Sequence, residues 1–170
     1  IVGDAKGNDT VALFFAGHGI NRGGGYYFVP TDAREEKGAD GTETFIEWSE
    51  VQAAINRVQG RRLLFLDACH ASNSYYHGLT EDAKVSRFFA FTAAKAEQFA
   101  EEATKVKHGQ FTYALINGLG GRALDETARA ILLYDLASYV SKEVERATNG
   151  RQTPEFFTTP GEGNFALVKR

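Results

Sequence analysis

Short runs of consecutive apolar residues recur along the chain, and polar or glycine-rich segments separate them. The runs that we interpret as strands are Thr10 to Ala16, Leu63 to Leu66, Phe88 to Thr92 and Asn164 to Val168. The first three are continuous in strand-forming residues, so they predict strands buried on both faces of a sheet. Tyr26 to Val29, between the turn sequence NRGGG and Pro30, predicts a further short strand or hairpin arm.

Three other segments have apolar residues at helical spacing. They are Phe45 to Val58, followed by Gly60; Phe111 to Leu119, followed by Gly120-Gly121; and Leu132 to Ala147, followed by Asn149-Gly150. Glycine or asparagine just beyond the last periodic residue is typical of a helix end. We expect the first helix to cross between two parallel strands, at 10–16 and 63–66. The segments 32–44 and 97–108 are polar and predict loops. Alternating strands and helices predict an α/β protein.

Composition narrows the class of protein. The chain has 170 residues, with 43% hydrophobic and 24% charged residues, which suits a single globular domain over residues 1–170. A net charge of −3 gives no reason to expect nucleic acid or an anionic membrane as a partner. A single cysteine excludes an intrachain disulfide. No apolar run approaches the roughly 18 residues that a bilayer requires. We expect a cytoplasmic protein.

The single cysteine, Cys69, follows the apolar run at 63–66, and His18 follows the run at 10–16. In open parallel sheets, chemistry gathers beyond the carboxyl ends of strands, so both residues should emerge at one edge. A thiol and an imidazole side by side are what nucleophilic thiol catalysis requires. The alternatives are that Cys69 is a small core residue and His18 a turn residue. His70, His77 and His108 have no fixed place in this hypothesis.

Other chemistries fit less well. A single cysteine and scattered histidines lack the spacing of metal ligands. The glycine-rich stretch Asn21 to Gly25 lacks the Lys-Ser/Thr pair of a phosphate loop. An α/β-hydrolase nucleophile would need glycine where Asp67 and Ala71 stand.

Two segments, Phe15-Ala16-Gly17-His18-Gly19 and Asp67-Ala68-Cys69-His70-Ala71, resemble the motifs of the caspase-type cysteine peptidase domain, closest to the metacaspase and orthocaspase branch. Their histidine and cysteine are 51 positions apart, near the spacing of about 50 typical of caspases. Supporting segments follow in family order: YFVPTD at 27–32, FTAA at 91–94, HGQFTY at 108–113 and QTPE at 152–155.

The resemblance implies a three-layer α/β/α sandwich around a mostly parallel sheet. It implies a part like the caspase large subunit at 1–76, a flexible loop at 70–87 and a part like the small subunit at 88–170. Cys69 would attack the scissile carbonyl, His18 would transfer protons, and the backbone N–H groups of Gly19 and Cys69 would hold the oxyanion.

The resemblance also assigns Asp67 to the pocket for the residue before the scissile bond, as in metacaspases, where caspases carry glutamine. A carboxylate there pairs with Arg or Lys and repels Asp, so we expect protein or peptide substrates cleaved after Arg or Lys. The alternative is that Asp67 caps a helix or loop near Cys69.

Some features depart from the family. Only about nine residues precede Thr10, so we expect the usual N-terminal strands to be absent or on a separate segment or regulatory domain. The acidic residues after His18 are scattered, so we expect no metal cofactor, and activation by calcium stays an open alternative. Lys84 and Arg87 are the basic candidates for self-cleavage, and a solvated charged loop is the alternative there. Two functions remain open: an active Arg/Lys-specific cysteine endopeptidase, and an inactive caspase-like module that acts in protein interaction.

Overall fold

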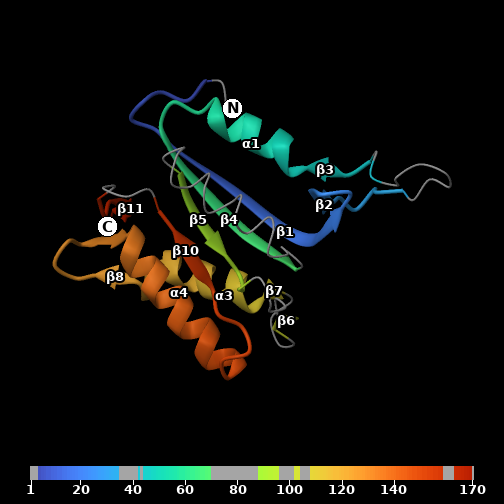
Figure 1. Ribbon diagram of the computed structural model, residues 1–170. Helices are drawn as coiled ribbons and strands as arrows, with labels where there is room; N and C mark the ends of the chain where they lie inside the picture. The colour runs from blue at the N-terminus through green and yellow to red at the C-terminus, as the bar shows by residue number, and fades with distance from the viewer. Residues whose placement is uncertain are drawn as a thin grey trace.

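The computed structural model describes residues 4–34, 42, 44–69, 88–95, 102–103, 108–158 and 163–169. A six-stranded sheet, in the order β10-β5-β4-β1-β2-β3, forms the centre of the fold (Figure 1). Its strands are β1 (Thr10–Arg22), β2 (Gly25–Val29), β3 (Ile46–Glu47), β4 (Arg61–Cys69), β5 (Phe88–Thr92) and β10 (Glu155–Phe157). The central strands β1, β4 and β5 are parallel, whereas β2, β3 and β10 pair antiparallel at the two edges.

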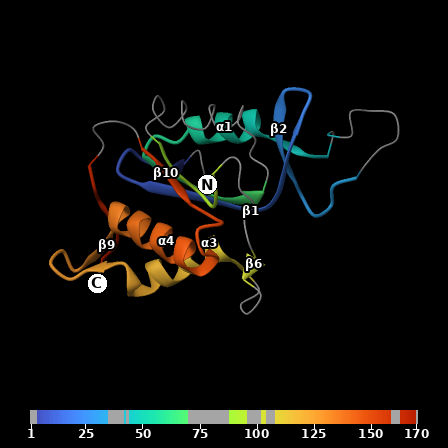
Figure 2. The ribbon, with the colours of Figure 1, turned by 60° about the horizontal axis from the view of Figure 1, so that its bottom comes forward.

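Helices cover both faces of this sheet. One face carries α1 (Trp48–Asn56), and the other carries α3 (Gln110–Asn117) and α4 (Leu133–Thr148) (Figures 1 and 2). Alternate side chains of β4 supply the two cores: Leu64 and Leu66 pack in the cluster with α1, while Leu63 and Phe65 pack in the cluster with α3 and α4. The predicted α/β class, with a sheet between helical layers, is confirmed.

Smaller elements complete the α3 and α4 side. After α3 comes η2 (Gly118–Arg122), a π-helical turn, and a second sheet has the strand order β11-β9-β8. Its strands are β8 (Leu124–Asp125), β9 (Ala130–Leu132) and β11 (Ala166–Lys169). β6 (Glu102–Ala103) pairs with β7 (His108–Gly109). No helix in the described parts of the chain is long and apolar enough to cross a membrane.

Several predicted boundaries were wrong. The strand predicted at 10–16 runs on to Arg22, because a hairpin with β2 continues its hydrogen-bonded ladder. Only Gly23 (φ 57°) and Gly24 (φ 82°) form the turn, and glycine readily adopts the positive φ that a two-residue hairpin turn requires. The helix predicted from Phe45 begins at Trp48, after β3. The predicted loop at 97–108 contains β6 and the first residue of β7.

Candidate active site

The pairing of β1 with β4 places residues 18 and 69 next to each other. The two strands are parallel and in register from Thr10 opposite Arg61 to His18 opposite Cys69. Neighbouring strands lie about 4.8 Å apart, so the two backbones are close at this pair. The sequence predicted that His18 and Cys69 would lie together beyond the carboxyl ends of two parallel strands. The backbone confirms that they are neighbours, at the last pair of the parallel ladder. The side chain of Cys69 lies outside the described part of the structure.

The sequence predicted that His18 would come at the end of its strand. That prediction was wrong, because β1 continues past His18 into the hairpin with β2. There His18 pairs with Val29, and its side chain is exposed. A pocket of ≈ 120 Å³ adjoins it, with Phe15, Phe28 and Pro30 among its lining residues. His18 therefore faces solvent beside an apolar pocket, two strands in from the sheet edge formed by β3.

The glycines on either side of His18 have separate structural roles. Gly17 has a φ of 150°, a conformation that other residues rarely adopt. A Cβ atom at Gly19 would clash with the hydroxyl of the buried Tyr26. Packing thus accounts for Gly19 without the oxyanion role that the family resemblance implies, and that role stays a prediction.

Asp67 is the buried acid of the site. Its exposed fraction is 8%, although it lies within three residues of the end of β4. The hydroxyl of Thr112, in the first turn of α3, donates a hydrogen bond to Oδ2 of Asp67, and the backbone N–H of Thr112 donates another. Burial raises the pKa of Asp67, and the two bonds from Thr112 oppose that rise because they stabilise the charged form.

The start of α3 passes very close to this carboxylate. A Cβ atom at Gly109 would lie 2.6 Å from Oδ2 of Asp67, so only glycine fits without displacement. Gly109 is also the N-cap residue of α3, and no side chain of its own can cap the helix. Asp67 instead accepts a hydrogen bond from the backbone N–H of Thr112. It therefore caps the start of α3, which is the alternative role that the sequence left open for it.

The segment after β5 is tied to the end of β4. The N–H of Ala93 donates to the carbonyl oxygen of Leu66 at 2.9 Å. The side-chain amide of Gln152, which is fully buried, donates to the carbonyl oxygen of Ala93 at 2.8 Å. Two of the supporting motifs, FTAA and QTPE, therefore meet beside the strand that carries Asp67.

Sequence reasoning missed the contacts of Gly109 and Thr112 with Asp67. The signal was present, since both residues belong to the HGQFTY segment, but nothing in the sequence joined that segment to Asp67. Lys84, Arg87, His70 and His77 lie outside the described residues. Across the described residues, no group of three or more His, Cys, Asp or Glu side chains could hold a metal ion.

Comparison of the chain with known proteins identifies its family. The caspase domain of peptidase family C14 matches residues 2–165. The chain belongs to the caspase-domain family. This caspase domain is also similar to the crystal structure of protein GSU0716 from Geobacter sulfurreducens, with a TM-score of 0.57 and 19% sequence identity. That match covers 99% of this chain and 73% of the other, and at this identity it supports the fold alone. The comparison with curated proteins gave no match.

Proposed function

We propose that this caspase domain is a cysteine endopeptidase that cleaves peptide bonds after Arg or Lys. The observation that carries the proposal is the register of the central strands, which sets His18 directly opposite Cys69 at the end of the parallel pairing. Membership of the caspase-domain family supports a peptidase. The buried carboxylate of Asp67, two residues before Cys69, supports the preference for a basic side chain.

In this mechanism His18 takes the proton of the Cys69 thiol, and the sulfur attacks the scissile carbonyl carbon. The N–H groups of Gly19 and Cys69 hold the resulting oxyanion. When the tetrahedral intermediate collapses, the C–N bond breaks and His18 returns the proton to the leaving amine. Water, with His18 again as base, then hydrolyses the thioester and releases the new carboxylate.

Asp67 supplies the specificity in this proposal. A buried carboxylate loses hydration, and a guanidinium or ammonium group from the substrate restores favourable electrostatics. A substrate Asp would place two negative charges together in a poorly hydrated site, which is unfavourable. Thr112 contributes by donating two hydrogen bonds to the charged form of Asp67, which favours the ionised state that the substrate requires.

The first test is hydrolysis of fluorogenic peptides that end in Arg, Lys or Asp, by the wild type and by Cys69→Ala and Asp67→Asn variants. We expect cleavage of the Arg and Lys peptides only, with no activity in Cys69→Ala. A Glu145→Gln variant, which removes an exposed negative charge from α4, should retain full activity. Equal turnover of the Asp peptide would refute the specificity.

A thiol-reactive peptide probe, read by mass spectrometry, separates the proposal from the alternative of an inactive module. An active dyad should be labelled at Cys69, and labelling should collapse in His18→Ala. Labelling that is absent, or that is unchanged in His18→Ala, would contradict catalysis by this dyad.

The same specificity makes Lys84 and Arg87 the candidates for self-cleavage. The wild type, but not Cys69→Ala, should then yield fragments that end at one of these residues. Intact-mass measurement after incubation checks this expectation, and replacing both residues with Gln should keep the chain whole.

A further inference from the structure

A second pocket lies between α3 and α4, and its lining residues include none of those that contact Asp67 or adjoin His18. Its volume is ≈ 120 Å³. Because a cavity of roughly 10–15 Å³ holds one water molecule, this pocket has room for a group several waters in size. Its polar lining comes from Gln110, Tyr113 and Asn117 on α3, from Arg122 in η2, and from Tyr139, Glu143 and Arg146 on α4.

Hydrogen-bond donors dominate this lining. The guanidinium of Arg122 contacts the hydroxyl oxygen of Tyr139, and among the described residues it has no carboxylate partner. Arg has no acceptor atom, so Arg122 donates in that contact and the Tyr139 proton stays available. Burial, with the nearby Glu143 carboxylate, raises the pKa of Tyr139, so its hydroxyl keeps that proton at neutral pH.

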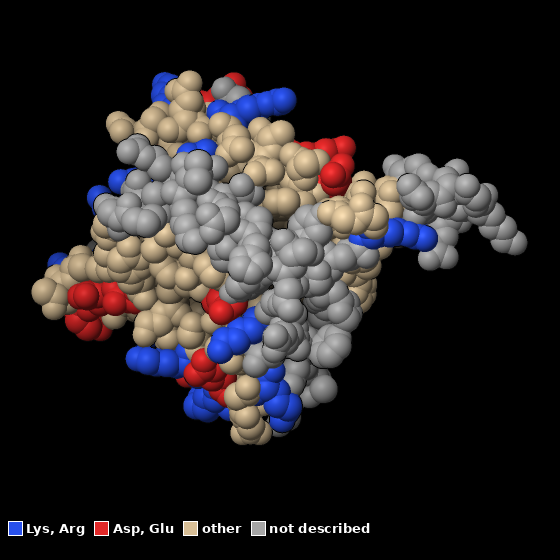
Figure 3. Space-filling model, viewed as in Figure 1, with Lys and Arg blue, Asp and Glu red and all other residues tan. Residues whose placement is uncertain are grey.

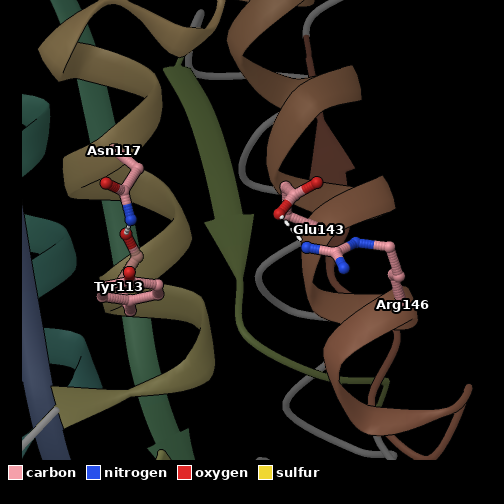
Figure 4. A network of polar contacts seen from close by, with 4 residues as sticks. All are labelled: Tyr113, Asn117, Glu143 and Arg146. Carbon is pink, nitrogen blue, oxygen red and sulfur yellow. Dashed lines mark hydrogen bonds and ion pairs between the residues drawn. The ribbon is translucent and has the colours of Figure 1, made fainter.

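The one acid of the pocket is already engaged. Glu143 pairs with Arg146 through one guanidinium nitrogen at 2.8 Å (Figure 4). The side chain of Arg146 is 74% exposed. The Asn117 amide is also used, because it donates to the backbone oxygen of Tyr113 at 2.9 Å. Basic and acidic groups are interspersed over the face of α4 seen in Figure 3. An excess of positive charge in the pocket therefore comes from its own lining residues and not from a basic surface around it. Two Arg against one Glu give the pocket a net positive charge.

We propose that the α3–α4 pocket binds a phosphate group, free or as a monoester, with Arg122 as its principal cation. Donors from α3, η2 and α4 line the space, and this number of donors suits a phosphate, which has more acceptor oxygens than a carboxylate. Arginine matches phosphate with a fork of N–H donors, and the phenol hydroxyls add donors at the rim.

The test is calorimetric titration of the whole chain with inorganic phosphate at constant ionic strength, repeated with phosphoserine and with acetate. We expect saturable binding of phosphate, at least tenfold weaker binding in Arg122→Gln, and weak or no binding of acetate. Tighter binding of phosphoserine than of phosphate would assign the site to a monoester, and the reverse order to the free ion.

The matched control is Arg57→Gln, which removes an exposed cation just after α1, on the opposite side of the sheet. It should bind as the wild type does. If Arg122→Gln unfolds, Tyr139→Phe replaces it, since that change removes a hydroxyl and keeps the ring. The proposal is overturned if phosphate does not saturate, if acetate binds equally well, or if Arg57→Gln weakens binding as much as Arg122→Gln.

Discussion

The two halves of the candidate active site differ in how firmly the fold holds them. Asp67 is 8% exposed and accepts two hydrogen bonds from Thr112. His18 is exposed, and no described side chain hydrogen-bonds its ring. Under the proposed function Asp67 is the specificity half, and it is thus fixed before substrate arrives, whereas among the described residues the imidazole of His18 has no third group that orients it.

Among the variants that test this comparison, His18→Ala should have the largest effect. Loss of the general base should lower kcat/KM for an Arg peptide about 10³-fold. Because the side chain is exposed, the melting temperature should stay unchanged. Peptide kinetics and thermal unfolding measure the two effects. A loss of activity below tenfold, or a large fall in melting temperature, would break the contrast between the halves.

Asp67→Asn should act on both specificity and stability. The variant leaves the substrate cation unpaired, so kcat/KM for Arg and Lys peptides should fall about 10²-fold. A raised pKa means that the folded state binds more protons than the unfolded state, so stability falls as pH rises above the ordinary value of 3.8. Asparagine carries no charge and still accepts a hydrogen bond from Thr112.

The melting temperature of Asp67→Asn should therefore exceed that of the wild type at neutral pH, and the difference should vanish in acid below that value. Thermal unfolding across pH, with Glu145→Gln as the charge control, provides the measurement. A variant less stable than the wild type at neutral pH would show that the capping role outweighs the cost of burying the charge.

Gly109→Ala should lower activity less than Asp67→Asn does, mainly by raising KM. The added methyl group would lie 2.6 Å from Oδ2, so the carboxylate or the start of α3 must shift. We expect kcat/KM for Arg peptides to fall about tenfold, because small displacements of a positioned group cost much of its effect. Gly7→Ala is the control, since its Cβ would meet nothing within 4 Å. Equal kinetics in the two variants would show that Asp67 tolerates movement.

Thr112→Val should give the smallest effect and the most specific one. Valine keeps the shape of threonine but loses the hydroxyl donor, so the pKa of Asp67 should rise further. Activity toward Arg peptides should fall a few-fold at neutral pH, and the acid limb of the pH–rate profile should move to higher pH. Thr112→Ser retains the hydroxyl and should keep the wild-type profile. Identical profiles in all three proteins would remove Thr112 from the specificity half.

Local patterns predicted the main helices and strands and the parallel pairing of β1 with β4, whereas the side-chain contacts around Asp67 were not predictable. The helix α4 ends where the sequence indicated, with Asn149 in the left-handed conformation. The strand at Leu63 to Leu66 is buried on both faces, as its continuous apolar run predicted. The same prediction was wrong for Thr10 to Ala16, where Phe14 is 49% exposed. The predicted position of His18, at the end of its strand, was wrong because pairing with β2, and not the apolar run, determines where β1 ends. The bond from Thr112 to Asp67 joins residues 45 positions apart, and no local pattern encodes it.

The parallel pairing of β1 with β4 also has a consequence for folding. Residues 18 and 69 become neighbours only when strands separated by the hairpin and α1 align along their full common length. Such non-local pairing raises contact order and slows folding, because the entropy of closing the intervening chain is lost before many contacts form. In a nascent or partly folded chain, the thiol of Cys69 and the imidazole of His18 are therefore not yet neighbours. Under the proposed function, proteolytic activity would appear only after the central strands have assembled.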